Sequence, residues 1–282
     1  MQKASLSFRL YVACFYLFLF APLVVVALFA FNASLYPAPP WKGFTIEWFT
    51  GTGSLFGKPG ILRDPAMLTA LVNSLKIAVP VTVLAVVLGT ANAFVLERRH
   101  FPGKTLLSMM MLWPLVIPGV ILGISILAFS SRIANGLENW LNMDLDFLRP
   151  GLFLVILGQL SFILTISTLI IAARLKKFDR TLEEAAFDLG ASRTRVFRTI
   201  TLPFLKPALI GAGLVALLMS FENFNTTLIL VGSDAPLPIY MYGQMREGAT
   251  PALNAASLLL MVVAGVLATL VAFISSRKPL ES

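Results

Sequence analysis

The sequence contains little charge, one cysteine and one histidine. Only 13% of its 282 residues are charged, whereas soluble globular proteins contain about 25%. A soluble globular protein is therefore excluded. Cys14 has no second cysteine with which to form an internal disulfide, and Cys14 and His100 alone are too few for a zinc or iron–sulfur site within this chain.

Hydrophobic residues make up 57% of the chain, and the mean hydropathy is +0.85. A membrane-spanning helix needs about 20 mostly apolar residues, and six segments satisfy this requirement. The sequence therefore predicts an all-α polytopic membrane protein, a single membrane domain over residues 1–282. Trp41 and Trp48, after the first span, are predicted to anchor at the membrane interface. The predicted spans are Tyr11–Phe31, Ala70–Leu96, Thr105–Ser130, Gly151–Ala173, Pro207–Val231 and Asn254–Ser275.

The distribution of Lys and Arg predicts the orientation, because cytoplasmic loops carry an excess of both. Of the 22, fifteen lie on one side of the predicted membrane and six on the other, and Lys76 lies near the start of the second span. The richer side is predicted to be cytoplasmic, with both termini on it. The formal charge of +8 is then mainly a topology signal, and no nucleic-acid partner is predicted. The fifteen are Lys3, Arg9, Arg98, Arg99, Lys104, Arg174, Lys176, Lys177, Arg180, Arg193, Arg195, Arg198, Lys206, Arg277 and Lys278.

The sequence lacks a complete site for an energy source. Gly103-Lys104-Thr105 matches the end of a phosphate-binding loop, but Arg98 stands where the first glycine is needed. No paired carboxylates lie within a span, so no catalytic, cofactor or metal residue is assigned to this chain. If the protein works against a gradient, another subunit must hydrolyse ATP.

The longest segment on the cytoplasmic side, residues 174–206, is the most informative. Thr181 is predicted to cap a short helix, and Glu184, three residues later, to close a capping box. Glu183 and Glu184 also lie in the first turn, where the helix dipole favours negative charge. The apolar residues of this helix follow the i, i+3, i+4, i+7 pattern, which predicts one apolar stripe. The stripe comprises Leu182, Ala185, Ala186 and Leu189.

Gly190 is predicted to end this helix in the left-handed conformation. Ser192 is predicted to cap a second helix that runs through Ile200 and ends at Pro203. Two interpretations stay open on physical grounds. The first helix either lies on the membrane or on its own bundle, or projects as a docking knob on which the alanines permit close approach by a partner.

The residues of this loop resemble the EAA loop of ABC importer permeases. Glu184-Ala185-Ala186, then Gly190, then Ile200-Thr201-Leu202-Pro203 follow the spacing of that motif. In that family the loop is the coupling helix, which sits in a groove of the ATP-binding subunit and converts its closure into movement of the membrane helices. The resemblance implies coupling helices over about residues 181–200. The implied ATPase-coupling residues are Glu184, Ala185, Ala186, Leu189, Gly190, Ile200, Leu202 and Pro203.

Further motifs along the chain resemble the spermidine/putrescine permeases of this family. This resemblance implies the type I ABC importer architecture, a multi-pass position in the bacterial inner membrane, and half of the translocation path for a small amine-bearing solute such as a polyamine. The implied partners are a second permease subunit, an ABC ATPase dimer that binds ATP and Mg²⁺, and an extracytoplasmic solute-binding protein. The motifs are Phe31-Asn32-Ala33-Ser34, Trp41-Lys42-Gly43-Phe44-Thr45, Asn73-Ser74-Leu75, Pro114-Leu115-Val116-Ile117-Pro118, Leu237-Pro238 and Pro251-Ala252-Leu253-Asn254-Ala255.

A polar patch interrupts the fifth predicted span at Glu222, Asn223, Asn225 and Thr226. An acidic side chain inside the membrane usually faces a cavity or a partner. The patch is therefore interpreted either as part of the substrate path or outer gate, or as a polar contact between two permeases.

The substrate stays open as well. Polyamine permeases carry two adjacent aspartates at this place and another after the second proline of the third span. Here the chain has Glu222-Asn223 and Gly119. Fewer negative charges favour a substrate with fewer positive charges than spermidine, such as a diamine, an amino acid, an opine-like conjugate or another small organic solute.

Two functions from other classes are weighed against this one. A channel or secondary transporter that works without an ATPase would need coupling carboxylates in several spans, and only Glu222 is available. A membrane scaffold would need the knob but not the polar patch. Gln159 and Thr165 are predicted to form hydrogen bonds between helices, and Gly119 and Gly123 to permit close helix packing.

Overall fold

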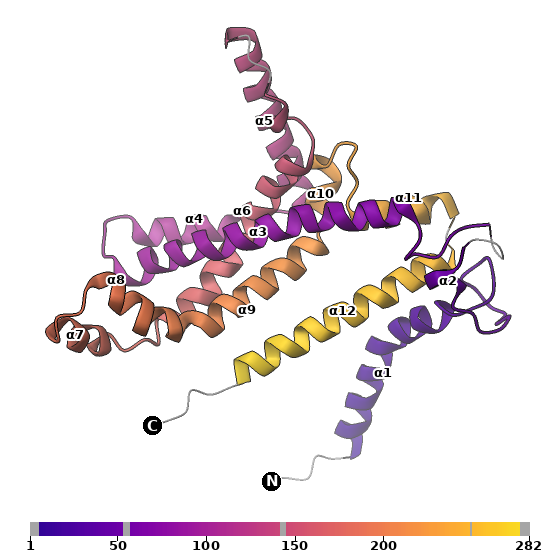
Figure 1. Ribbon diagram of the computed structural model, residues 1–282, viewed down its shortest axis with the longest axis horizontal. Helices are drawn as coiled ribbons and strands as arrows, with labels where there is room; N and C mark the ends of the chain where they lie inside the picture. Colours follow the sequence, from indigo (N-terminus) through magenta and orange to yellow (C-terminus); the bar gives the residue numbers. More distant parts are fainter. Residues whose placement is uncertain (1–5, 53–56, 142–144, 249, 277–282) are drawn as a thin grey trace. The chain divides into compact units, whose positions relative to one another are not determined.

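The computed structural model describes residues 6–52, 57–141, 145–248 and 250–276, and these residues form helices joined by loops. Of the basic residues that predict the orientation, Lys3, Arg277 and Lys278 lie outside the described residues. The elements, of which Figure 1 labels the α-helices, are α1 (Leu6–Phe29), α2 (Glu47–Thr50), α3 (Pro65–Arg98), α4 (Lys104–Val116), α5 (Gly119–Leu141), the 3₁₀ turn η1 (Asp146–Leu148), α6 (Leu152–Leu175), α7 (Thr181–Asp188), α8 (Arg193–Val196), the π-helical turn η2 (Phe197–Thr201), α9 (Leu202–Phe221), α10 (Asn225–Leu230), α11 (Leu237–Gly248) and α12 (Pro251–Ser276).

Six helical segments in the described part of the chain are long and apolar enough to cross a membrane. This confirms the predicted all-α fold with six spans, although several boundaries differ from the predicted ones. The segments are Leu6–Phe29, Pro65–Arg98, Gly119–Trp140, Leu152–Leu175, Arg193–Phe221 and Pro251–Leu270.

The chain forms two compact units, of which the first comprises Met1–Thr69 and Tyr240–Gly265. Its loop after α1 is organised around Asn32, which is fully buried. The Trp48 indole N–H donates to the Asn32 carbonyl at 2.9 Å, and the Lys42 N–H donates to Asn32 Oδ1 at 2.9 Å. Trp48 is only 1% exposed, so its predicted role as an interfacial anchor is wrong. Its indole fills the centre of the loop instead.

The start of α3 is also fixed within this first unit. Asp64 Oδ1 accepts the Ala66 N–H at 2.9 Å, and Asp64 Oδ2 accepts the Tyr240 hydroxyl of α11 at 3.0 Å. Burial, the hydrogen bond to Asp64 and the negative charges of Asp64 and Glu247 raise the pKa of Tyr240 to about 12. Tyr240 therefore remains a neutral donor throughout the physiological pH range.

The second unit comprises Ala70–Ile239 and Val266–Ser282. Helix α6 is apolar on every side, as is typical of a helix in a core or across a membrane. Half of its most apolar window is buried, the largest share of any candidate span. One apolar cluster joins α3, α6, α9 and α10, and a second joins α3, α6 and the start of α9. The buried members are Ile77, Val81, Ala85, Leu154, Val155, Ile163, Ala216, Leu230 and Val231 in the first, and Ala93, Ile171, Ala172, Leu175, Phe178, Leu205 and Ala212 in the second.

The third predicted span, Thr105–Ser130, is divided between α4 and α5. Ile117 has φ −73° and ψ 127°, an extended conformation between the two helices. Pro118 explains the break, because its ring disfavours a helical conformation at the preceding residue and it has no N–H to donate. Helix α5 then continues beyond the predicted end to Leu141.

The fifth predicted span, Pro207–Val231, is wrong at both ends. Helix α9 ends at Phe221, and α10 begins at Asn225, so Glu222 lies after a helix end and not inside a continuous helix. At the other end, Pro203 does not stop the preceding helix. The chain is helical from Arg193 to Phe221. The π-helical turn η2 directly before Pro203 already interrupts the regular α-helical hydrogen bonds, so the N–H that a proline lacks is not needed there.

Candidate functional site

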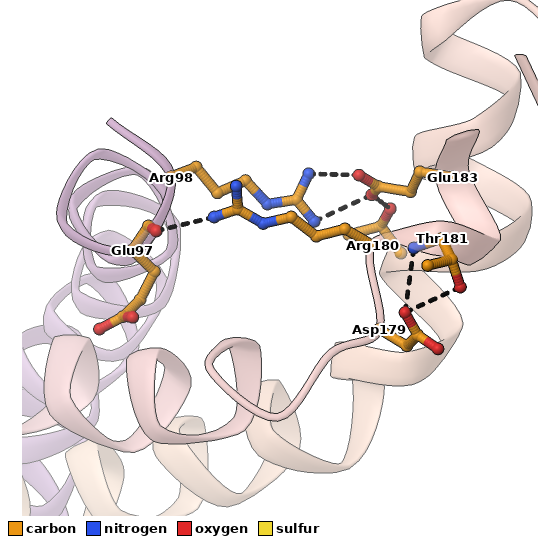
Figure 2. A network of polar contacts seen from close by, with 7 residues as sticks. Glu97, Arg98, Asp179, Arg180, Thr181 and Glu183 are labelled. Carbon is orange, nitrogen blue, oxygen red and sulfur yellow. Dashed lines mark hydrogen bonds and ion pairs between the residues drawn. The ribbon is translucent and has the colours of Figure 1, made fainter. Parts of the chain in front are cut away.

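The first candidate site is the 174–206 loop, which includes α7, η2 and α8. Figure 1 shows α7 and α8 together beyond the ends of α3 and α9. The Asp179 carboxylate accepts both the Thr181 N–H at 3.0 Å and the Thr181 hydroxyl at 2.8 Å (Figure 2). Because Asp179 already satisfies the Thr181 N–H, the predicted capping box is wrong, and the Glu184 side chain is exposed.

Glu183, the neighbour of Glu184, points toward α3 instead. Its carboxylate accepts two hydrogen bonds from Arg98, at 2.5 Å from Nη1 to Oε2 and 2.9 Å from Nη2 to Oε1 (Figure 2). The Thr201 hydroxyl of η2 donates to the same Oε1. One carboxylate therefore connects α7 to the end of α3 and to the turn that leads into α9.

The electrostatics around Glu183 favour its ionised form. Burial of its carboxyl, which is 12% exposed, favours the neutral form. The hydrogen bonds from Arg98 and Thr201 and the charges of Arg98 and Arg180 outweigh burial, so the pKa of Glu183 lies below its ordinary value. The Arg98 guanidinium in turn lies over the rings of Phe94 and Phe178, at 4.9 and 5.5 Å from their centroids.

The opposite side of α7 is open. Leu182 is 53% exposed and Leu189 is 89% exposed, and within α7 no residue is fully buried. The predicted apolar stripe therefore exists, but the chain's own bundle does not cover it. Gly190 has φ +80°, which confirms the predicted left-handed end of the helix.

The second helix of the loop begins at the predicted cap, Ser192, but does not end at Pro203 as predicted. Ser192 Oγ accepts the Arg195 N–H at 3.4 Å, which confirms the cap of α8. Ile200 packs against the apolar cluster that joins α3, α6 and the start of α9. Leu202 and Pro203 are exposed at the beginning of α9. The implied coupling residues thus include both exposed side chains and one that fixes the base of the loop.

The second candidate site is the 222–224 break between α9 and α10. The Gln159 amide of α6 joins the two sides of this break. The Ser220 hydroxyl donates to Gln159 Oε1, and Gln159 Nε2 donates to Thr227 Oγ1 at 2.9 Å. Thr227 Oγ1 donates in turn to Asn223 Oδ1 at 3.0 Å. Gln159 is 1% exposed, and the prediction of an interhelical hydrogen bond from it is confirmed.

Glycines bring α10 close to its neighbours. A Cβ at Gly119 would lie 3.1 Å from Thr226 Oγ1, and one at Gly123 would lie 3.1 Å from Ile229 Cβ. A Cβ at Gly158 would overlap the Leu230 side chain. The prediction that Gly119 and Gly123 permit close helix packing is therefore confirmed.

The four predicted path residues divide into two kinds. Thr226 is fully buried, and its hydroxyl donates to the Gly119 carbonyl at 3.2 Å, while Asn223 is half-buried and bonds Thr227. These two hold the break in place. Glu222 and Asn225 are exposed, and the Glu222 carboxylate forms no hydrogen bond or ion pair with the described residues. Only these two are free to meet a solute or a second subunit.

Sequence reasoning missed the residues that attach α7. The sequence alone identifies Arg98 as a topology signal and Glu183 as a favourable charge near a helix N-terminus, and it pairs neither with the other. They are 85 residues apart, and no local periodicity pairs them. The available signal was that Glu183 lies outside the apolar stripe, on another side of the same helix.

Known proteins provide an independent comparison. The sequence profile of the family described as "Binding-protein-dependent transport system inner membrane component" matches residues 82–278, a range that contains both candidate sites. The putrescine transport system permease protein PotI of Escherichia coli (strain K12) is 32% identical, over 92% of this chain and 87% of that protein. The spermidine/putrescine transport system permease protein PotC of Haemophilus influenzae is 27% identical, over 93% of each chain.

The fold has a solved counterpart. The crystal structure of a bacterial ABC transporter involved in the import of the acidic polysaccharide alginate contains a chain that matches with a TM-score of 0.73. The match covers 96% of this chain and 94% of that chain at 19% sequence identity, so it supports the fold alone.

Proposed function

The chain belongs to the family of binding-protein-dependent transport system inner membrane components, and from this premise we propose that it forms half of the translocation path of an ATP-driven importer for a small amine-bearing solute. It is a multi-pass permease subunit of an ABC importer in the bacterial inner membrane. ATP hydrolysis then belongs to a separate ATPase dimer that holds ATP and Mg²⁺. Both termini are proposed to lie in the cytoplasm, which the excess of Lys and Arg on one side supports.

The exposed stripe of α7 is the observation that carries this proposal. Leu182 and Leu189 remain open on a helix whose opposite side is fixed by Glu183. A helix of this kind fits a groove in a partner, because its apolar side chains gain burial only on docking. The ATPase is the proposed occupant, and the Gly190 turn sets the direction in which α7 meets it.

Alternating access is the proposed mechanism. ATP closes the ATPase dimer, the dimer moves the 174–206 loop of each of two permease subunits, and the subunits open toward a solute-binding protein outside. Within this chain, Glu222 and Asn225 at the 222–224 break face the path. The Glu222 carboxylate supplies a negative charge for an amine, and it lies directly after the end of α9.

The proposed substrate class follows from the charge of this site. One exposed carboxylate at the break suits a diamine better than a longer polycation. Both relatives above are named as permeases for putrescine, a diamine, and the second is named for spermidine as well. An amino acid or an opine-like conjugate is the second candidate, favoured by Asn225, whose amide can bond a carboxylate as readily as an amine.

Reconstitution tests the proposal. The tagged chain is purified with its native partner subunits and placed in proteoliposomes with its binding protein outside. Uptake of labelled putrescine, spermidine and an amino acid is measured with ATP, with a non-hydrolysable analogue, and with the ATPase omitted. We expect uptake only with ATP and the ATPase, with putrescine preferred over spermidine. Equal uptake by the permease alone would identify a channel or a secondary transporter instead.

A further inference from the structure

We propose that Glu183 is a positioning residue that transmits movement of the docked α7 helix to α3 and α9 at once. The inference rests on the proposed function, in which an ATPase moves α7. It differs from the docking role of the exposed stripe, because Glu183 bonds Arg98 and Thr201 of this chain.

The first link is the ion pair with Arg98. Two parallel hydrogen bonds, at 2.5 and 2.9 Å, join the guanidinium of the last residue of α3 to the carboxylate of α7. A two-point contact between an arginine and a carboxylate fixes orientation as well as distance. The Arg98 side chain is 23% exposed and that of Glu183 is 12% exposed, so water and salt screen this pair less than a surface pair.

The second link reaches α9. Thr201 is 1% exposed, and its hydroxyl donates to the Glu183 carboxylate from the last position of η2. Since η2 continues directly into α9, a displacement of Glu183 is applied to the beginning of that helix. The carboxylate is therefore a common point for segments that are separated by more than a hundred positions along the chain.

The Arg98 side chain is held in place by residues outside α7. Phe94 and Phe178 support its guanidinium, and a second arginine crosses between the same elements. Arg180 Nη2, from the residue before α7, donates to the Glu97 carbonyl at 2.9 Å (Figure 2). A supported guanidinium loses little freedom when it bonds, so the contact is stiff enough to transmit displacement.

The contacts of α7 leave few alternatives to this link. None of its residues is fully buried, and the contacts it makes with α8 and η2 are local along the chain. Among the described residues, the Arg98–Glu183 pair is the side-chain ion pair that joins α7 to a membrane helix distant in the sequence. Without it, one exposed hydrogen bond, from Arg180 to the Glu97 carbonyl, would remain to carry movement of α7 to α3.

A double-mutant cycle in the complete importer tests the inference. The variants are Glu183→Gln, Arg98→Gln and both together, reconstituted with the partner permease, the ATPase and the binding protein. Three quantities are measured on each preparation: ATPase that copurifies, ATP hydrolysis, and solute molecules imported per ATP. The matched control is Glu138→Gln, which breaks the exposed ion pair between Glu138 and Arg149 at 2.8 Å on a different part of the same unit.

We expect each single variant to retain the ATPase and its hydrolysis while import per ATP falls about tenfold, which lies within the usual range for a coupling between sites. The double variant should be no worse than either single variant, because both remove the same link. The control should match the wild type. If import per ATP is unchanged, or if the two losses multiply in the double variant, the proposed link is wrong.

This design distinguishes failure of the proposed function from failure of the inference about Glu183. If the wild-type complex neither binds an ATPase nor needs ATP, the proposed function itself fails. If the wild type is coupled and the variants are equally coupled, only the inference about Glu183 fails. If the Glu183→Gln and Arg98→Gln variants do not accumulate in the membrane, Arg98→Lys and Glu183→Asp replace them. These variants retain both charges but disturb the pair of parallel hydrogen bonds between the two side chains. A wild-type import-per-ATP ratio in those two variants then overturns the inference.

Discussion

Gln159 Nε2 donates to Thr227 Oγ1 at 2.9 Å, so a single amide on α6 connects to α10 across a helix break. The same amide accepts from Ser220, at the end of α9. The break is therefore a fixed structure with polar contacts on both sides. It is not a frayed helix end.

The first prediction concerns this amide. Gln159→Met keeps the length of the side chain but leaves the Ser220 hydroxyl without its acceptor. The free energy of unfolding should fall by about 1–2 kcal/mol, the usual range for a lost buried hydrogen bond that neighbouring groups partly replace. Thermal unfolding in detergent measures the change. Gln244→Met on α11 is the control, since Gln244 makes only a 3.5 Å contact at the surface, and an equal shift in both variants would argue against a special role for Gln159.

The second prediction concerns helix packing. Gly158→Ala places a methyl group against the Leu230 side chain, and α10 must move or repack. We expect a loss of about 1–3 kcal/mol in stability, as in other overpacked cores. Gly211→Ala on α9 is the matched control, because nothing lies within 4 Å of the added Cβ. That control should be neutral or slightly stabilising, and a stable Gly158→Ala protein would show that α10 is not tightly held.

The third prediction concerns the turn after α7. Gly190 has φ +80°, and nothing lies within 4 Å of a Cβ built there, so any effect comes from the backbone and not from a clash. Gly190→Val should strain the turn by about 1–2 kcal/mol and redirect α7. Import per ATP should fall while insertion in the membrane is retained. Gly190→Asn, which tolerates the left-handed conformation, should retain coupling, and equal losses in both variants would contradict the backbone explanation.

The fourth prediction concerns Glu222. Glu222→Gln preserves shape and removes the charge. If the carboxylate bonds an amine in a dry path, uptake of a cationic solute should fall about 10-fold to 100-fold, the equivalent of a charge-assisted hydrogen bond. Assembly and basal ATP hydrolysis should remain. Glu247→Gln on α11 is the control, and full uptake by the Glu222 variant would leave that residue with a structural role.

The fifth prediction concerns Tyr240 and pH. Its pKa is raised to about 12, above its ordinary value of about 10, so the Asp64 bond contributes stability below pH 10 and that contribution is lost as pH rises toward 12. The ultraviolet phenolate spectrum of the wild type, minus that of Tyr240→Phe, should therefore contain a step near pH 12. A step near pH 10 would show that Tyr240 does not hold this bond in solution.

The number of spans was predictable because each depends only on a local run of apolar residues. The break at Ile117–Pro118 also had a local cause in the proline. The break at 222–224 did not, because it depends on Gln159, which lies 61 and 68 residues from its two partners. A polar side chain in an apolar segment indicates that a partner exists, but its position in the chain does not identify that partner.

The 174–206 loop divides in the same way. The left-handed Gly190 and the exposed stripe follow from spacing within a few turns, and both were predicted. The roles of Glu183 and Glu184 were not separated, since two adjacent acids in a first helical turn look equivalent until the surrounding helices are placed. Arg98 and Thr201 make that distinction by their positions in space.

The exposed apolar side of α7 also affects the stability of the subunit against aggregation and degradation before assembly. A copy without its ATPase exposes Leu182, Phe187 and Leu189 to water at the edge of the membrane. Such surface favours aggregation and recognition by proteases, and docking removes it from their reach. If the ATPase docks on these side chains as proposed, the abundance of the permease should depend on the supply of that partner.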